Sequence, residues 1–371
     1  MKKQSNFLLS LLAVLLYSCN SSEDVISEES PIQKMLTEYY NSVTPKTRGT
    51  SNLVVTNISQ QYYQIIDDSV TVVTPISRAV TDSTIFDLST VQFRIGQKNG
   101  YALLSEDERI NSVLFFTDNG SISDTANIPA LKNLIVDMPY TASGIINNQN
   151  VSSRAEYNTI VYPLCEFSWG QSFPYNNCMP KCSSGKCSIL YNNHNPAGYV
   201  TTATAQAIAT IGKFRGTFYG CKDIDFSKLP TDSVGFVGNT FYQTQIATFF
   251  HEVALCCQTK FSCGYSYGNI RAVYHYLTDM DYDCFYAKGC VDINKLTTNL
   301  EAGYPHIISG GDTGIDTWII DGIRSNGYSY MEYHFNWGNG TSNCWTSSYT
   351  YTYYEGSSDK YSQLYINGVN N

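Results

Sequence analysis

The sequence predicts an α+β protein of two domains, on three observations. The chain has 371 residues, and about 350 of them follow an apolar N-terminal segment, which is enough for two domains of ordinary size. In residues 52–143, β-branched and aromatic residues either alternate with polar ones or form short runs, a pattern typical of antiparallel strands. Residues 195–214 (NPAGYVTTATAQAIATIGKF) instead predict a helix that begins at a proline and is lined with very small residues.

The first 19 residues predict an export signal. They have a basic start and an apolar run, Phe7–Tyr17, that is too short to span a membrane as a mature helix. The following LYSC resembles the lipobox of bacterial lipoproteins, although Tyr17 is atypical within it. That resemblance implies that Cys19 is the lipidated first residue and that the membrane is a partner through this anchor. The alternative is an ordinary cleaved signal peptide.

An acidic run follows the signal and resembles the surface-export tag of Bacteroidetes lipoproteins; it comprises Glu23, Asp24, Glu28 and Glu29. It implies an outer-membrane lipoprotein exposed at the bacterial cell surface. The formal net charge is −9 and the chain has no basic tract, so nucleic acid is not an expected partner. No cofactor is expected.

The chain contains 12 cysteines, and removing Cys19 leaves 12 − 1 = 11, an odd number. In an oxidising compartment most should pair, with at least one left over. They are densest in CMPKCSSGKC, residues 178–187, and in CCQTKFSC, residues 256–263. A zinc site in the first group is a possible alternative, but it has no paired C-x-x-C and only His194 nearby. We therefore expect disulfides and no metal.

Residues 20–51 predict a polar tether followed by the helix SPIQKMLTEYYNSV, in which Ser30 can cap the N-terminus and Pro31 fits the first position. Residues 52–150 then predict a small antiparallel α+β domain. Its strands are interrupted by turn signals at KNG and DNG, and NIPALKNLIVDM predicts a short helix.

This domain also contains NGYALLSEDERINSVLFFTDNGSISDTANIPALKNLI, which resembles the propeptide of streptopain-type cysteine peptidases. The alternative is a generic strand-rich accessory domain. The stretch contains no catalytic motif of its own.

Residues 155–371 resemble the peptidase domain of the same family in six ordered blocks. These are LCEFSWGQSFPYNNCMP, NPAGYVTTATAQAIA, FFHEVALCCQTKFSCGYSYGN, LTTNLEAGYPHIISGG, DTWIIDG and YHFNWGNG. The resemblance implies a papain-like α+β domain in which the helix near Pro196 packs against the strands carrying residues 317–321 and 333–337.

A papain-like site needs a cysteine at a helix N-terminus, where the helix dipole favours the thiolate. A facing histidine pairs with the cysteine, an Asn or Asp orients the histidine, and a glutamine stabilises the oxyanion. By the resemblance, Gln171 falls on the oxyanion position, and Asn336 and Trp337 fall on the motif that orients and covers the histidine. Tyr199 replaces the cysteine and Asp316 replaces the histidine.

Both replacements remove reactivity. A phenol has a pKa of about 10, roughly 1.5 units above that of a free thiol. An ionised carboxylate only accepts hydrogen bonds and cannot act as an imidazolium. We therefore expect the Tyr199 hydroxyl to lie near Asp316 and to fill the catalytic centre while the cleft walls remain.

Other residues are weaker candidates for the missing roles. Thr201 and Thr202 follow Tyr199 on the same helix but point elsewhere by about 100° per residue, and Cys256 and Cys257 fall in a different helix. His334 lies two residues before Asn336, on the same strand face, where a structural role is expected. His194 precedes the helix and has no nucleophile to activate.

The sequence favours a pseudopeptidase that binds a peptide or protein without cleaving it. The alternative is an active secreted cysteine-type endopeptidase or hydrolase with a displaced catalytic site. A third hypothesis is a lipoprotein whose propeptide-like domain inhibits a neighbouring peptidase. Any Cys or Ser within hydrogen-bond reach of a His near Gln171 would favour the second hypothesis.

Overall fold

The computed structural model describes residues 30–44, 52–67, 69–74, 83–110, 112–126, 128–147, 157–182, 191–212, 224–289, 291–310, 316–325, 331–347 and 362–369. It mixes helices with strands that all pair antiparallel, which confirms the α+β class. The predicted signal, lipobox and acidic run lie outside these residues. No helix of the described part is long and apolar enough to cross a membrane.

The N-terminal part consists of one docked helix, an antiparallel meander and two further helices. In chain order the elements are α2 (Pro31–Val43), β1 (Leu53–Ile66), β2 (Ser69–Val73), β3 (Ile85–Ile95), β4 (Lys98–Ser105), β5 (Ser112–Thr117), the 3₁₀ turn η1 (Ile122–Ala126), α3 (Pro129–Val136) and α4 (Met138–Asn147). The predicted cap of α2 is confirmed, since the Ser30 hydroxyl accepts the Gln33 N–H at 3.2 Å and Pro31 begins the helix.

One turn was placed wrongly by the sequence. The β3–β4 turn lies at Gly96 and Gln97, and the KNG signal at 98–100 is already part of β4. Gly96 has φ +62°, a left-handed conformation that glycine adopts without strain. The second turn signal, DNG, does follow the end of β5.

The C-terminal part alternates helices with the remaining strands. The elements are β6 (Thr159–Val161), α6 (Tyr199–Gly212), the 3₁₀ turns η2 (Phe226–Lys228) and η3 (Val234–Phe236), α7 (Thr240–Cys256), α8 (Ile270–Asp279), β7 (Tyr282–Lys288), α9 (Ile293–Glu301), β8 (His306–Gly310), β9 (Asp316–Ser325), β10 (Met331–Asn336), β11 (Cys344–Ser347) and β12 (Ser362–Val369). The predicted helix after Pro196 and the strands carrying DTWIIDG and YHFNWG are therefore present.

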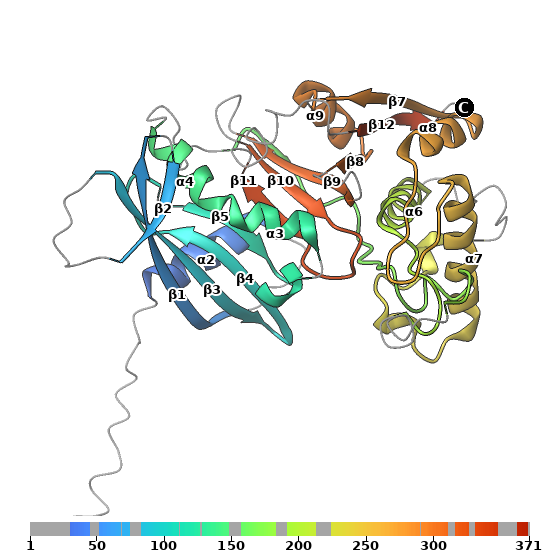
Figure 1. The fold of residues 1–371 in the computed structure, drawn as a ribbon, viewed down its shortest axis with the longest axis horizontal. Coiled ribbons are helices and arrows are strands. Elements are labelled where there is room, and N and C mark those ends of the chain that lie inside the picture. Colours follow the sequence, from blue (N-terminus) through green and yellow to red (C-terminus); the bar gives the residue numbers. More distant parts are fainter. Residues whose placement is uncertain are drawn as a thin grey trace, which may run out of the picture.

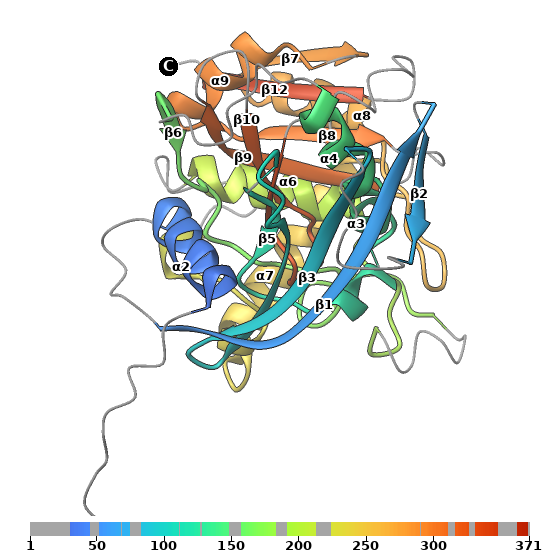
Figure 2. The ribbon, with the colours of Figure 1, turned by 90° about the vertical axis from the view of Figure 1, so that its left-hand side faces the viewer.

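A single sheet runs through both parts. Its order is β2-β1-β3-β4-β5-β11-β10-β9-β8-β12-β7, and β6 pairs with β9. The junction is the pairing of β5 with β11, where Trp345 faces Phe116 and Thr346 faces Phe115. Figure 1 shows strands β1–β4 at one end of the molecule and helices α6 and α7 at the other. Figure 2 shows α2 beside the sheet, near β5.

Helix α6 is the centre of the C-terminal core. Every one of its residues is buried, and it packs against β9 and β8 on one side and α7 on the other. Its Ala and Thr side chains are small enough for these elements to approach closely on all sides. The predicted contact between this helix and the strand carrying Thr317 to Asp321 is thus confirmed.

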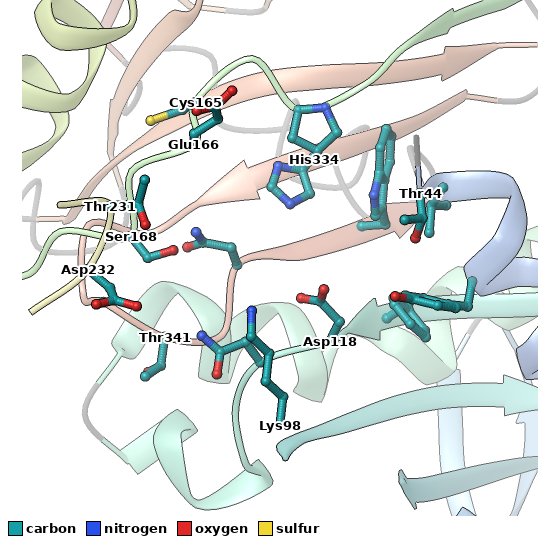
Figure 3. Close-up of a pocket in the computed structure, with 18 of the residues that line it drawn as sticks. Thr44, Lys98, Asp118, Cys165, Glu166, Ser168, Thr231, Asp232, His334 and Thr341 are labelled. Carbon is teal, nitrogen blue, oxygen red and sulfur yellow. The ribbon is translucent and has the colours of Figure 1, made fainter. Parts of the chain in front are cut away.

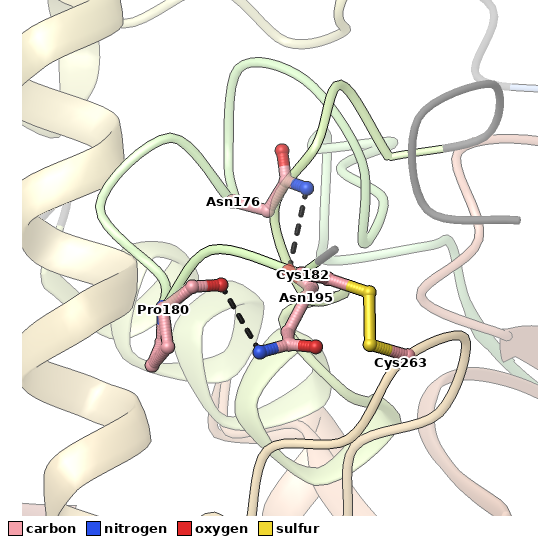
Figure 4. The surroundings of a disulfide bond; sticks show 5 residues. All are labelled: Asn176, Pro180, Cys182, Asn195 and Cys263. Carbon is pink, nitrogen blue, oxygen red and sulfur yellow. Dashed lines mark hydrogen bonds between the residues drawn. A yellow bond between two sulfur atoms is a disulfide. The ribbon is translucent and has the colours of Figure 1, made fainter. Parts of the chain in front are cut away.

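One disulfide, Cys182–Cys263, is present in the described residues, with a Cα–Cα distance of 5.7 Å. Around it, the Asn195 side chain donates to the Pro180 carbonyl at 3.0 Å (Figure 4). The bond joins the segment before α6 to the loop after α7, and it makes Cys182 unavailable as a zinc ligand. Free thiols are present at Cys178, Cys256, Cys257, Cys284 and Cys344, so the expectation that most cysteines pair is wrong for the described part.

Candidate functional site

Tyr199 is the first residue of α6 because the preceding glycine permits a tight approach to the helix. Gly198 has φ +91°, and a Cβ there would lie 2.8 Å from the Ser266 carbonyl oxygen. Its own carbonyl accepts the Thr202 N–H at 3.0 Å and so opens the helix. The geometry places Tyr199 in the first turn, as the sequence predicts.

The Tyr199 phenol is buried, with 9% of the residue exposed. Its hydroxyl shares a hydrogen bond with the Gln171 side chain. Burial raises the pKa of Tyr199 well above its usual value of 10, and the negative charge of Asp316 raises it further, while the Gln171 bond lowers it only in part. The phenol therefore stays neutral at physiological pH and lies against the glutamine assigned to the oxyanion.

Asp316 begins β9 at the edge of the same site and is 7% exposed. Burial raises the pKa of its carboxyl to about 6, although the backbone N–H of Ala130 donates to it and lowers the pKa. Ala130 lies in the first turn of α3, where backbone N–H groups have no partner within the helix. The N-terminal part thus contacts the position that the family resemblance assigns to histidine.

The side chain of Asn336 forms its hydrogen bonds with groups other than Asp316. Its side-chain oxygen accepts from Gln206 Nε2 at 3.2 Å and from the Gly338 N–H at 3.1 Å, and its amide donates to the Phe167 carbonyl at 3.0 Å. These bonds tie β10 to α6 and to the segment before it, and none of them goes to Asp316.

Trp337 is buried in the apolar cluster on the N-terminal side of the sheet. Its ring lies 5.6 Å from that of Trp318 and 5.3 Å from that of Phe335. In this position it supports the strand that ends beside the cleft.

A second tyrosine joins the site from the loop after α7. Burial raises the pKa of Tyr265, and the charges of Asp316 and Tyr199 raise it further, which places the three groups within electrostatic range of one another. The disulfide at Cys263 lies two residues before Tyr265 and ties its loop to the segment before α6.

The alternative nucleophiles are engaged elsewhere. Thr201 shares a hydrogen bond with Thr259 at 2.9 Å, and the Thr202 hydroxyl donates to the Gly198 carbonyl at 3.0 Å. Cys257 is fully buried, and burial raises its pKa to about 12. The Nδ1 atom of His194 lies 2.7 Å from the Met179 carbonyl oxygen.

His334 faces a pocket of about 450 Å³ at the junction of the two parts (Figure 3). Its Nδ1 lies 2.6 Å from Asp321 Oδ1, and the other Asp321 oxygen accepts the Cys165 N–H at 3.0 Å. The Cys165 thiol points away from His334, toward the Phe167 carbonyl at 3.5 Å. Among the described residues, no Cys or Ser hydrogen bonds to His334.

Two features of the site are missing from the sequence-based picture. The Asp321–His334 pair joins residues from two strands, and the Ala130–Asp316 contact joins two parts of the chain. The four residues could be read in the sequence, but their pairing depends on strand register and on how the two parts dock. Short-range sequence patterns do not encode either of these.

The buried helix α6, with its first turn near the start of the antiparallel strand β9, belongs to a mixed α+β fold similar to that of papain-like cysteine peptidases. Residues 169–345 match the model of the peptidase C10 family. This segment of the chain is therefore similar to the streptopain family of cysteine peptidases.

One solved structure supports the fold, and a second matches less of the chain. A mutant fragment of prointerpain A from Prevotella intermedia has 18% identity and a TM-score of 0.55, and the match covers 74% of this chain and 94% of that one. Active wild-type interpain A, a cysteine protease from the same organism, has 18% identity and a TM-score of 0.43, with 58% and 97% covered. A search of curated proteins found no match.

Proposed function

We propose that this chain is a pseudopeptidase, a streptopain-family protein that binds a peptide or protein without cleaving it. The observation that carries the proposal is the neutral, buried phenol of Tyr199 at the nucleophile position, hydrogen bonded to Gln171. Peptide cleavage by this family's chemistry needs a thiolate and a free oxyanion donor. The Tyr199 phenol stands where the thiolate would be, and it hydrogen bonds to Gln171, the glutamine that would donate to the oxyanion.

The acid–base partner is also missing. With a pKa of about 6, Asp316 is mostly ionised at pH 7 and then only accepts hydrogen bonds. It cannot protonate a leaving amine as an imidazolium would. Ligand binding at this end of the cleft would also compete with the contact between Ala130 and Asp316.

Purified protein spanning residues 20–371 should therefore leave casein and short peptides intact. During long incubation it should also remain a single band of full mature length. The double variant Tyr199→Cys/Asp316→His should gain a thiol at a helix N-terminus beside an imidazole, and so react faster with iodoacetamide than Tyr199→Cys alone. Electrophoresis and alkylation rates measure the two effects.

The wild type and Tyr199→Phe serve as controls, since neither adds a thiol. Cleavage by the wild-type protein that a cysteine alkylator blocks would contradict the proposal and favour the displaced-site hydrolase. Release of a fragment of the chain over time in a protease-free preparation would contradict it too.

We also propose that Cys19 is lipidated and anchors the protein in the bacterial outer membrane, exposed at the cell surface. The support is the LYSC sequence after the apolar run and the acidic run that follows it. Cells fed an alkyne-labelled fatty acid should label the wild-type protein, and Cys19→Ala should abolish the label. Cys178→Ala, which changes an exposed cysteine, is the matched control. Equal labelling of wild type and Cys19→Ala would refute the anchor.

A further inference from the structure

A buried ion pair lies where α2, β9 and β10 meet. Arg324 and Glu332 face each other on neighbouring strands, and only 1% and 2% of their side chains are exposed. The Arg324 Nε atom donates to Glu332 Oε2 at 2.8 Å, and Nη2 donates to the same oxygen. Both residues belong to the C-terminal part of the chain.

The N-terminal helix completes the hydrogen bonding of this pair. Arg324 Nη1 donates to the Ser42 hydroxyl at 2.6 Å, and the Tyr39 hydroxyl donates to Glu332 Oε2 at 3.0 Å. Both groups come from α2, 282 and 293 residues away in the sequence. Tyr39 and Ser42 are three residues apart and therefore share one face of the helix.

Aromatic rings enclose the guanidinium. Its Cζ atom lies 4.2 Å from the Tyr157 ring centroid, 4.8 Å from that of Tyr39 and 5.5 Å from that of Trp345. The Tyr157 hydroxyl also donates to Glu332 Oε1 at 3.1 Å. A buried ion pair is tolerated only when its remaining donors and acceptors are satisfied, so α2 supplies what the pair requires.

The two parts are joined at further points. Strand β5 pairs with β11, and Trp345 of β11 is buried in the apolar cluster that contains Leu36 of α2. The Ser342 N–H donates to the Asn119 carbonyl at 2.6 Å, and the Ser342 hydroxyl donates to Asp124 at 2.8 Å. Removing the N-terminal part would expose an edge strand and an apolar surface together.

We propose that residues 31–147 are a permanent half of this protein and not a removable propeptide. The receptor surface on the C-terminal part is the Arg324–Glu332 pair with Trp345, and its partner is the face of α2 that carries Tyr39 and Ser42. If the chain is cut between the halves, the two fragments therefore remain bound to each other without a covalent link. The inference concerns docking and does not depend on whether the cleft is catalytic.

The test uses the full chain with a recognition sequence for a site-specific protease inserted between Asn147 and Tyr157. After complete cleavage, the two fragments should co-elute in size-exclusion chromatography in native buffer and separate only in urea. The variant Tyr39→Phe/Ser42→Ala removes two hydroxyls and leaves the apolar face of α2. Its cut fragments should dissociate at a lower urea concentration, with a dissociation constant at least about tenfold higher.

Tyr62→Phe is the matched control, because it removes a hydroxyl that bonds only locally, to Gln60 at 3.1 Å on the same strand. Circular dichroism of each uncut variant establishes that it is folded before cleavage. Separation of the wild-type fragments in native buffer would overturn the proposal. The proposal would also be overturned if the cut fragments of Tyr39→Phe/Ser42→Ala dissociated at the same urea concentration as those of Tyr62→Phe.

Discussion

Replacing Arg324 by methionine should lower the free energy of unfolding by about 3–5 kcal/mol, because it leaves the Glu332 carboxylate buried without its counter-ion. Glu332 is 2% exposed, and the strongest of its bonds are those with the guanidinium. The hydroxyls of Tyr39 and Tyr157 would remain as its donors. Two neutral hydroxyls do not replace a positive charge at this depth.

The double variant Arg324→Met/Glu332→Leu should recover most of this loss, since it removes both charges and keeps an apolar volume against the surrounding rings. Lys228→Met is the control, because it breaks an exposed ion pair with Asp225 that is open to solvent. Guanidinium unfolding at pH 7 measures all three. A near-wild-type Arg324→Met, or a double variant no more stable than Arg324→Met, would contradict this expectation.

The local elements could be predicted because their causes are local. Ser30 and Pro31 define the start of α2, and the small residues after Pro196 fit only a helix surrounded by other elements. The turn between β3 and β4 was missed because KNG is a strong turn signal, whereas the strand pair turns at Gly96 two residues earlier. The register of the pair depends on which faces are buried, and this overrode the local signal.

The relations between distant segments could not be predicted in the same way. The sequences of β5 and β11 give no indication that Phe116 faces Trp345, since each strand alone is compatible with many partners. The same limit applies to the cleft, where the sequence predicted that the Tyr199 hydroxyl lies near Asp316. The structure gives it a hydrogen bond with Gln171 and an electrostatic interaction with Asp316.

Asp316→Asn should make the protein more stable than the wild type at pH 7.5 and equally stable near pH 4. The carboxyl has a pKa of about 6 in the folded protein, against 3.8 as its ordinary value, because burial disfavours the charged form. The folded state therefore binds more protons than the unfolded state between these two values. Stability must fall as pH rises through this window and stay lower above it.

The size of the effect follows from a shift of about two units at about 1.4 kcal/mol per unit, which gives at most about 3 kcal/mol above pH 6. Asparagine cannot ionise, and its side-chain oxygen can still accept the Ala130 N–H, so the variant escapes this cost without losing the contact. Asp283→Asn, which changes an exposed carboxylate, is the control. Urea midpoints at pH 4 and pH 7.5 measure the difference, and an Asp316→Asn protein less stable than the wild type at pH 7.5 would show that the carboxylate is not penalised by burial.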